Sequence, residues 1–334
     1  MKKPDDKSFY SFEKLVDLME ERKIIIEDRD NAIYTLKNIP YYNLINNHKQ
    51  TFAIYDENED EYIDDYENTS FAEIRIVYDF ERLLSSILYK YISVFEETLK
   101  SLIPHSISKE YGFLQSEYLD PDVYDKGRLK YDDKGNSYTD RDKLLAKLNE
   151  RISSSYNQSI IHYKNEYHNV PPWILVNDCT FGELVNWLKL SNLNIKTEIV
   201  NHCFNKNNSK TDFNSLLFHC LYNINEFRNI VSHGGRIFHH KCKHELSPGL
   251  LKNYLQKYSI SMRNNCIGQD GILSIVFSLI CVFSNRDTVK NNFIDEIVSS
   301  FQQFDNNNNE IMSKLLDRCD IKMESISRLQ EFKN

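Results

Sequence analysis

Residues 70–104 read SFAEIRIVYDFERLLSSILYKYISVFEETLKSLIP and predict one long amphipathic helix. Apolar side chains recur in it at steps of three and four, at Val77, Phe80, Leu84, Ile87, Tyr91 and Val94. Side chains with that spacing share one face of a helix, so we expect a continuous buried stripe. Ser70 and Glu73 have the separation of a capping box that begins the helix, and Pro104 is expected to end it.

Helical periodicity continues on both sides of this segment. Before it, two short helices are expected between residues 10 and 37, the first capped by Ser11 and the second followed by Pro40. After it, helices are predicted over 141–167, from the capping box at 180–183, from about residue 211, and in three stretches beyond 250 with a polar turn at 306–309. No sustained alternating pattern of strands and no internal repeat is found. The predicted fold class is therefore all-α.

The chain divides, on this pattern, into three parts. Residues 1–69 form a short N-terminal helical region with an acidic loop, residues 70–248 a helical bundle core, and residues 249–334 a C-terminal helical extension. Glycine (9) and proline (7) are too scarce for an architecture rich in turns or flexible linkers. A hydrophobic content of 41% excludes global disorder.

The charge of the chain is unevenly distributed. The formal net charge is −8, which at first argues against a nucleic-acid partner. Residues 56–67, DENEDEYIDDYE, hold eight carboxylates and no base, and without them 41 acidic residues balance 41 basic ones. The acidic run is interpreted as a solvated loop, with two alternatives: a mimic of RNA phosphate that covers a basic groove, or a surface complementary to the basic residues after 235.

Targeting and cysteine patterns favour a cytoplasmic protein. The N-terminus, MKKPDDKSFY, has no apolar stretch of the kind that a secretory signal needs. The longest apolar run, residues 272–283, is too short to cross a bilayer and predicts a buried helix, so no membrane partner is expected. Seven cysteines are scattered without CxxC spacing, so neither a disulfide framework nor a zinc ribbon is indicated, and reduced thiols are expected.

The helix that begins near residue 211 ends in EFRNIVSHGGR, residues 226–236. Gly-Gly after a periodic segment ends a helix, and Gly234 suits the left-handed position just beyond it. His233 then lies in the last turn, where the helix dipole favours a protonated ring. Arg228 lies five residues earlier, about 140° around the helix, so a single copy makes a poor catalytic pair. Two copies of the chain across a two-fold axis would supply two Arg and two His around one cleft.

Such a cluster suits cleavage of an RNA backbone without a metal. One imidazole removes the proton of a 2′-hydroxyl that attacks the adjacent phosphate, and another, or a water, protonates the leaving 5′-oxygen. Guanidinium groups stabilise the phosphorane charge, and Asn229 would orient Arg228 or bond the phosphate. An arginine five to seven residues before a histidine occurs by chance about once in a chain with ten histidines, so the motif alone is weak. The alternative is a structural helix terminus in which Arg228 pairs with Glu226 or another acid.

Several separated segments are similar to one family. They are SFEKLVDLMEERKIII (11–26), NIPYYNL (38–44), YDFERLLSSILYKYISVFEETLK (78–100), SKEYGFLQSEYLDP (108–121), PPWILVNDCTFGELVNWL (171–188) and FRNIVSHGGRIF (227–238). In order and spacing, over roughly residues 10 to 245, the chain resembles the Abi-like (AbiD/AbiF) abortive-infection family, whose core belongs to the HEPN superfamily of ribonucleases. The resemblance implies a HEPN-type helical bundle and an antiviral endoribonuclease of the toxin type.

The same resemblance assigns roles to individual residues. It implies that Arg228 and His233 are the catalytic pair and that Asn229 is the polar residue that follows the arginine. Where the family commonly has a second histidine, this chain has Gly234. Glu96 matches an acidic position that would orient Arg228, although an exposed helical Glu is an equal alternative. The implied activity is metal-independent cleavage, leaving a 2′,3′-cyclic phosphate, in a homodimer that needs no cofactor. A cognate antitoxin or small RNA is the partner expected to regulate it.

A basic strip follows the helix. Its candidate RNA-binding residues are Arg236, His239, His240, Lys241 and Lys243. A metal site built from His240, Cys242 and His244 fits no standard spacing, so no metal is predicted. Tyr41, Tyr42 and Trp173 are candidates for stacking on bases, although most such aromatic residues lie in the core.

Three classes of function stay open on the sequence. The first is an RNA-cleaving defence effector. The second is a non-catalytic RNA-binding or antitoxin-like regulator with the same fold. The third is a scaffold in which the Arg-Asn…His turn is structural.

Overall fold

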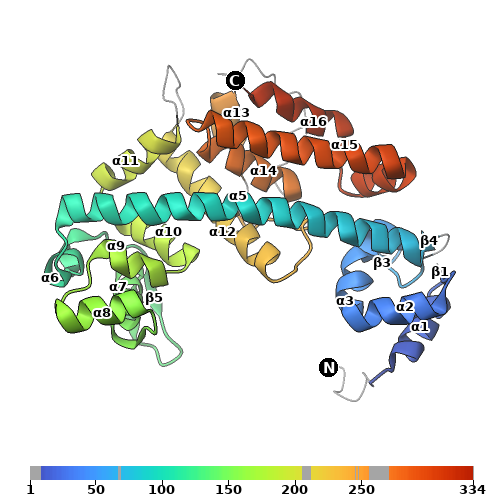
Figure 1. The fold of residues 1–334 in the computed structure, drawn as a ribbon, viewed down its shortest axis with the longest axis horizontal. Coiled ribbons are helices and arrows are strands. Elements are labelled where there is room, and N and C mark those ends of the chain that lie inside the picture. The colour runs from blue at the N-terminus through green and yellow to red at the C-terminus, as the bar shows by residue number, and fades with distance from the viewer. Residues whose placement is uncertain are drawn as a thin grey trace. The chain divides into compact units, whose positions relative to one another are not determined.

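The computed structural model describes residues 9–66, 69–204, 212–244, 246, 248–255 and 271–333. Its longest described helix is α5, Phe71–Tyr111 (Figure 1). The predicted capping box begins it: the Ser70 hydroxyl accepts the Glu73 N–H at 3.1 Å, and the Glu73 carboxylate accepts the Ser70 N–H at 2.7 Å. Two of the N–H groups that the first turn would leave unpaired are thereby satisfied.

Helix α5 continues through Pro104, so the prediction that Pro104 ends it was wrong. The side chains of Ile103 and Ile107 on either side are fully buried. Burial of this face outweighs the one backbone hydrogen bond that proline removes, so the apolar stripe carries the helix on to Tyr111. Gly112, with φ of +97°, follows the last helical residue.

The other helices are mostly short. They are α1 (Phe12–Glu21), α2 (Arg29–Asn38), α3 (Tyr41–Leu44), η2 (Asn46–His48), α4 (Lys49–Phe52), α6 (Gln115–Tyr118), η3 (Pro121–Val123), α7 (Asp140–Ser154), α8 (Gln158–Glu166), α9 (Pro172–Leu175), η4 (Val176–Asp178), α10 (Phe181–Leu190), α11 (Leu193–Cys203), α12 (Phe213–Ser232), α13 (Pro248–Leu255), α14 (Gly271–Val282), α15 (Asp287–Arg318), α16 (Met323–Ser327) and η6 (Arg328–Phe332). The all-α prediction is confirmed.

The strands of the described chain have two or three residues each. They are β1 (Ile24–Ile25), β2 (Tyr55–Asp56), β3 (Glu61–Tyr62), β4 (Thr69–Ser70), β5 (Leu129–Tyr131) and β6 (Ser137–Thr139). Strand β1 pairs in parallel with β4, and β2–β3 and β5–β6 are antiparallel hairpins. Such short pairs brace connections between helices and form no sheet with a core of its own.

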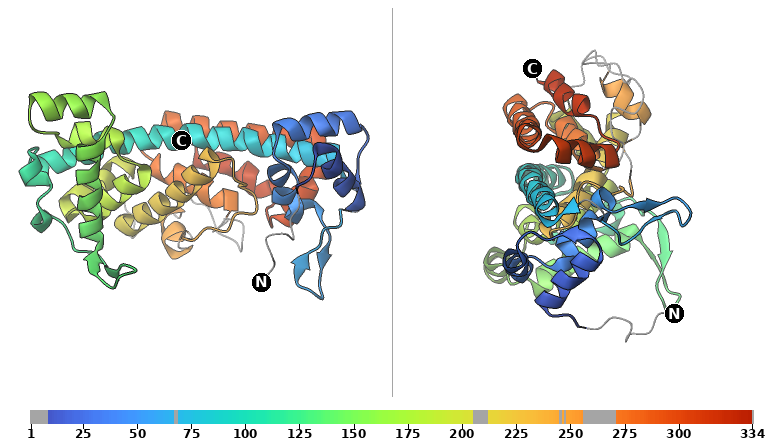
Figure 2. Two further views of the ribbon diagram at one scale, coloured as in Figure 1. Left: turned by 90° about the horizontal axis from the view of Figure 1, so that it is seen from below. Right: turned by 90° about the vertical axis from the view of Figure 1, so that its right-hand side faces the viewer.

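The single helix predicted over 141–167 is divided into α7 and α8. The break lies at residues 155–157, and Figure 2 shows α8 running in a different direction from α7. Tyr156, expected on the buried stripe, is 93% exposed. The physical reason lies in the polar residues of this stretch, whose side chains compete with the helix for backbone groups. Asn157 illustrates this, because its side chain accepts the N–H of Ser159 and begins α8.

The C-terminal third agrees with prediction in its buried helix and in the break of helical geometry at residues 306–309, where two helices meet. Residues 272–282 of α14 are all buried, as the apolar run predicted. The polar segment 306–309 is part of α15 and appears there as a kink, with Asn308 at φ −144° and ψ 48°. Phe304 and Met312 on either side are buried, so both halves of α15 keep an apolar face.

The chain forms two compact units, each built from distant segments. The first unit contains residues 1–88, 229–241 and 295–330, and the second contains 89–228, 242–294 and 331–334. In the first unit the ring of Phe80 stacks on Phe304 and Phe238 and meets Phe301 edge to face. The division of the chain at residues 69 and 248 stays a prediction.

The second unit has a separate aromatic core around the C-terminal half of α5. The ring of Tyr91 packs against Phe283 and Phe293, and the ring of Phe95 meets Phe283 edge to face. Trp187 of α10 is fully buried, and its indole N–H donates to the Tyr124 hydroxyl at 2.9 Å. The ring contacts hold α5, the residue that follows α14 and the start of α15 together, and the Trp187 bond ties α10 to the residue that follows η3.

The acidic run lies in the first unit. Residues 57–61 are exposed at the β2–β3 hairpin. Asp64 pairs with Arg22 at 2.9 Å and with Lys49 at 2.6 Å, and Asp65 pairs with Lys23. Part of the run thus neutralises basic side chains of its own unit; Glu67 lies outside the described residues.

Two further sequence expectations concern thiols and membranes. The six cysteines in the described part of the chain are free thiols, and Cys266 lies outside it. Among the described helices, none combines the length and the apolar character that a membrane span requires.

Candidate functional site at the end of helix α12

Helix α12 changes character along its length. Its part up to Phe227 buries an apolar face with Leu216, Leu217, Cys220, Leu221, Ile224 and Phe227. Directly after Phe227, Arg228 is half-buried, and Asn229, Ser232 and His233 are exposed. A well-anchored helix therefore presents a polar, accessible C-terminal turn.

The end of α12 is fixed by its two glycines. Gly234 has φ of +67°, in the left-handed region, as predicted. The Gly235 N–H donates to the Ile230 carbonyl at 2.9 Å, and the His233 N–H faces the carbonyls of Asn229 and Ile230 at 3.2 and 3.3 Å. The Gly235–Ile230 bond is the 6→1 bond of a Schellman ending, and it restrains the backbone around His233.

Arg228 is brought to the acidic residue that the sequence paired with it. Its Nε lies 3.7 Å from Glu96 Oε2, while Glu96 Oε1 lies 2.9 Å from Lys100 Nζ. The Arg–Glu distance is that of an ion pair and is longer than a hydrogen bond. The boundary between the units falls between Arg228 and Asn229, so Arg228 belongs to the second unit and His233 to the first.

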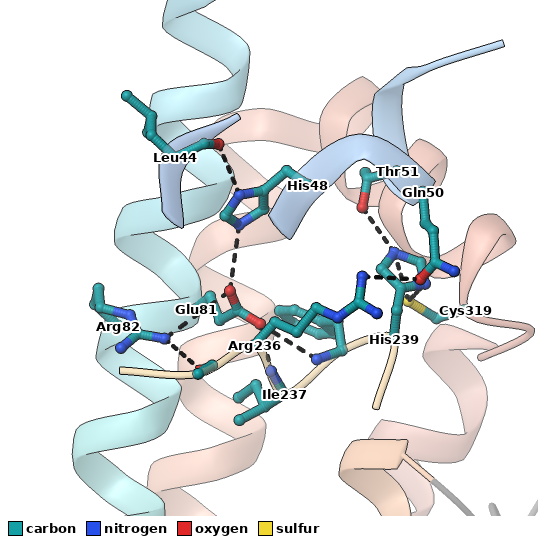
Figure 3. Close-up of polar contacts among 12 residues, drawn as sticks. Leu44, His48, Gln50, Thr51, Glu81, Arg82, Arg236, Ile237, His239 and Cys319 are labelled. Atoms are coloured by element: carbon teal, nitrogen blue, oxygen red, sulfur yellow. Dashed lines mark hydrogen bonds and ion pairs between the residues drawn. The ribbon is translucent and has the colours of Figure 1, made fainter. Parts of the chain in front are cut away.

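A buried carboxylate holds the chain that follows His233. Glu81 of α5 accepts the N–H of Ile237 at 2.6 Å and the N–H of Phe238 at 3.3 Å (Figure 3). The exposed fraction of its side chain is 3%. Burial alone raises the pKa of this carboxyl, but the His48 ring and the two N–H groups outweigh burial and lower the pKa below its ordinary value.

His48 completes the surroundings of this carboxylate. Its Nε2 lies 3.2 Å from Glu81 Oε2, and its Nδ1 lies 2.9 Å from the Leu44 carbonyl oxygen, as Figure 3 shows. Both ring nitrogens therefore face oxygen atoms. A histidine that is buried in this way links the carbonyl of α3 to the carboxylate of α5.

Arg82, next to Glu81 on α5, also binds this segment, but through a backbone carbonyl and not through N–H groups. Its guanidinium donates to the Gly235 carbonyl at 2.8 Å, and its Cζ lies 5.6 Å from the centre of the Tyr78 ring. A Cβ added at Gly234 would lie 3.3 Å from Arg82 Nη1. The left-handed backbone favours glycine here, and a methyl group would also lie tightly against the guanidinium.

Two predicted RNA-binding residues, Arg236 and His239, contact other side chains of the first unit. Arg236 donates to the Gln50 side chain at 3.3 Å, and His239 Nε2 lies 2.8 Å from the Thr51 hydroxyl. Burial, with the nearby charge of Arg236, lowers the pKa of His239 to about 4, so this ring is neutral at pH 7. His240 is half-buried and Lys241 is exposed.

The rest of the basic strip lies in the second unit. The Lys243 N–H donates to the Glu226 carboxylate at 3.0 Å, while the Lys243 side chain is exposed. The exposed His244 lies against the ring of Tyr222, with ring centres 4.9 Å apart. In the described residues no group of three His, Cys, Asp or Glu side chains is placed to hold a metal ion.

The aromatic candidates differ in accessibility. Tyr42 is 65% exposed and Trp173 is 45% exposed, with the Trp173 ring centre 6.1 Å from that of Phe113. The Tyr41 hydroxyl accepts a hydrogen bond from Arg22 at 2.8 Å. Tyr42 and Trp173 remain available for stacking, whereas Tyr41 has a structural partner.

Sequence reasoning missed Glu81, Arg82 and His48. A signal for the first was present, because Glu81 lies four residues after Val77 and three before Leu84, on the buried stripe of α5. A carboxylate at a core position requires buried partners. The partners themselves lie far along the chain, and nothing in the local pattern identifies them.

The fold and this site define an all-α protein with an accessible Arg-Asn…His turn at the end of a buried helix. The model of the Abi-like protein family matches residues 34–239, more than half of the chain, so the chain belongs to the Abi-like protein family. The matched range contains α5 and α12, and the predicted resemblance to this family is confirmed. Membership indicates a role in abortive infection. No curated protein and no solved structure matches the chain.

Proposed function

We propose that this protein is an antiviral HEPN-type endoribonuclease of the AbiD/AbiF kind that cleaves RNA without a metal ion. The observation that carries the proposal is the accessible polar turn at the end of α12, where exposed Asn229 and His233 follow half-buried Arg228. The ion pair between Arg228 and Glu96 supports it, because it holds the guanidinium while leaving part of it accessible. Family membership gives the defence context.

The chemistry follows from the groups at this turn. His233 takes the proton of an RNA 2′-hydroxyl, and the freed oxygen attacks the adjacent phosphorus. The bond from phosphorus to the 5′-oxygen breaks, and that oxygen receives a proton from a second imidazole or from water. The products are a 2′,3′-cyclic phosphate and a 5′-hydroxyl. Arg228 stabilises the negative charge of the phosphorane, and Asn229 hydrogen-bonds the phosphate or orients Arg228.

Two copies of the chain complete the site. The sequence contains one Arg-Asn…His turn, and a single turn offers one imidazole for two proton transfers. A homodimer supplies the second, with the two-fold axis passing near the phosphate. Glu96 orients Arg228 in each copy.

The RNA backbone is held by the neighbouring basic residues. Arg236, His240, Lys241 and Lys243 supply this contact, and at neutral pH His239 acts as a neutral hydrogen-bonding group. The setting is the cytoplasm, where a cognate antitoxin or small RNA restrains the enzyme.

The test is RNA cleavage by the purified full chain in excess EDTA, with product ends identified by mass spectrometry. We expect cyclic phosphate ends, a loss of about 10²–10⁴-fold for His233→Ala, and a smaller loss for Arg228→Lys, which keeps the charge and removes the planar fork. His105→Ala, an exposed histidine on α5, is the matched control and should cleave like the wild type.

Three outcomes contradict the proposal in different ways. Equal cleavage by His233→Ala rejects the assigned base, and a strict need for Mg²⁺ rejects the metal-free chemistry. Tight, salt-sensitive RNA binding without turnover supports the non-catalytic regulator instead. A large loss of thermal stability in Arg228→Ala, with neither binding nor cleavage by the wild type, supports a scaffold.

A further inference from the structure

We propose that Glu81 and Arg82 are positioning residues that fix the backbone of residues 234–238, the post-histidine segment, and so orient His233. This inference rests on the proposed function for its catalytic consequence. Its structural part stands on contacts within the first unit, which contains both residues and the whole segment. Neither residue touches the reacting groups in this scheme.

Three main-chain groups of the post-histidine segment are held by two adjacent residues of α5. Arg82 donates to the Gly235 carbonyl at 2.8 Å, and Glu81 accepts the N–H of Ile237 at 2.6 Å and of Phe238 at 3.3 Å. Figure 3 shows both side chains directed at this segment. The donor Arg82 thus binds a carbonyl of the segment and the acceptor Glu81 binds two of its N–H groups. Because the carbonyl and the N–H groups are both paired, the position and the orientation of this backbone are fixed.

The burial of Glu81 indicates that this arrangement has a specific purpose. An apolar side chain at this position would extend the stripe of α5 without the desolvation that a carboxylate undergoes at 3% exposure. The carboxylate is compensated by the two N–H groups, by His48 and by the Arg82 guanidinium, whose Nη2 lies 4.0 Å from Glu81 Oε2. Residue 81 is therefore suited to holding the post-histidine segment and not merely to filling the core.

The held segment begins at the residue after His233. Gly235 takes part in two of the fixing contacts, because its N–H closes the α12 ending on Ile230 while its carbonyl binds Arg82. Release of the carbonyl would leave only the Gly235–Ile230 bond of these two, so the backbone at Gly234 and Gly235, and with it the direction of the imidazole, would be less restrained. A catalytic group displaced by about 1 Å loses on the order of 10²-fold in rate.

The experiment compares Glu81→Ala with Glu81→Gln in the full chain. The glutamine retains an oxygen that accepts the two N–H groups, and its NH₂ can donate to a neutral His48 ring, whereas alanine leaves all three groups unpaired. Arg82→Met removes the donor to Gly235 while keeping an apolar stem. Leu36→Ala, which deletes a buried side chain of α2 in the same unit, is the control for general destabilisation.

The measurements are kcat and KM for RNA cleavage in EDTA, well below the melting temperature of each variant. We expect Glu81→Ala and Arg82→Met to lower kcat about tenfold to hundredfold with KM changed less than about twofold, because the chemical step needs the oriented ring and binding does not. Glu81→Gln should recover most of kcat. Leu36→Ala should lower the melting temperature and leave kcat unchanged. Equal kcat values in Glu81→Ala and the wild type, or equal losses in Glu81→Ala and Leu36→Ala, would overturn the proposal.

A second readout separates this inference from the proposed function. Hydrogen exchange of the peptide that covers residues 234–238, followed by mass spectrometry, reports the fixing contacts without any assay of RNA. We expect faster exchange in Glu81→Ala than in Glu81→Gln or Leu36→Ala. Unchanged exchange in Glu81→Ala rejects the positioning role. An inactive wild type with the expected exchange pattern rejects the nuclease and leaves the structural assignment in place, and a Glu81→Ala chain that does not fold leaves Arg82→Met to decide.

Discussion

Glu81 and Glu96 lie on the same helix, α5, but they differ in burial and in the groups that they contact. Glu81 is buried and surrounded by two backbone N–H groups and His48, with its contacts at 2.6 to 3.3 Å. Glu96 has more exposure, pairs with Lys100 at 2.9 Å, and reaches Arg228 only at 3.7 Å. The first region holds backbone groups in place, whereas the second pairs side chains that are partly exposed.

The comparison teaches that accessible side chains and the buried side chains that hold the backbone in place are different residues. Arg228, Asn229 and His233 are not buried, as the proposed contact with an RNA phosphate requires. Groups that are this exposed have little energy of their own to fix their direction. Direction has to come from the backbone, and the buried contacts of Glu81 and Arg82 supply it.

The largest expected effect is the difference in stability between two alanine variants. Glu81→Ala should lower the free energy of unfolding by about 3–5 kcal/mol, because it leaves His48 and two N–H groups buried without their partner. Glu96→Ala should cost less than about 1 kcal/mol, because its ion pairs are partly exposed. Urea unfolding followed by circular dichroism measures both. Equal losses would remove the distinction between the two carboxylates.

Acid should act next, through His239. Its pKa is lowered to about 4 in the folded protein by burial and by Arg236, so the folded state favours the neutral ring. This contribution is fully present above the ordinary pKa of 6.5 and is lost as the pH falls towards 4. Between pH 7 and pH 4.5 the loss should be about 2 kcal/mol. Glu81, whose pKa is also lowered, adds a loss in the same direction below pH 4.5.

The control for the pH effect is a pair of glutamine variants. His239→Gln should flatten the dependence of unfolding free energy on pH between 7 and 4.5, whereas His105→Gln, at an exposed position, should leave the curve of the wild type. The same urea series at several pH values measures it. A dependence that survives in His239→Gln would assign the acid sensitivity to other groups.

Substitution of Gly234 should lower the stability by a smaller amount, and the same substitution at Gly135 provides the comparison. Gly234→Ala strains a backbone at φ +67° and brings the new methyl to 3.3 Å from Arg82, so we expect a loss of about 2 kcal/mol. Gly135→Ala, at φ +82° in the exposed β5–β6 hairpin with no atom within 4 Å, should lose about 1 kcal/mol from the backbone alone. Thermal unfolding of the two variants checks the order. The reverse order would show that Arg82 yields to the methyl group without cost.

The smallest effects are expected where the chemistry is proposed. His233→Ala and Asn229→Ala should change the free energy of unfolding by no more than about 0.5 kcal/mol, since both side chains are exposed and the backbone bonds of the helix end remain. Differential scanning calorimetry provides the measurement. A loss above about 2 kcal/mol would mean that the turn is structural, and the comparison with Glu81 would fail.

Local signals made much of the fold predictable. Ser70 with Glu73 and Thr180 with Glu183 form the capping boxes that their spacing predicts, since each contact spans three residues. The two wrong helix boundaries arose where one physical effect outweighed the sequence signal on which the prediction relied. At Pro104 burial prevailed over the missing N–H, and at residues 155–157 polar side chains prevailed over apolar periodicity.

The candidate site was predictable only in part, for a similar reason. The helix end at Gly234 follows from two adjacent glycines, and the Arg-Asn…His turn is visible as a motif. The bonds from Ile237 and Phe238 to Glu81 join residues more than 150 positions apart, and His239 contacts Thr51. Pairs at such separations are set by the packing of whole elements, which no short window of sequence contains.

The first unit is built from segments far apart in the chain, and this determines when it can fold during synthesis. Phe80 packs against Phe238, but the same ring is covered by Phe301 and Phe304, which the ribosome adds much later. At roughly 5–20 residues per second, several seconds pass between Phe238 and Phe304. The nascent chain thus carries His233 before the aromatic cluster behind it can close. The first unit, which contains His233, is therefore complete only after the C-terminal third has been made.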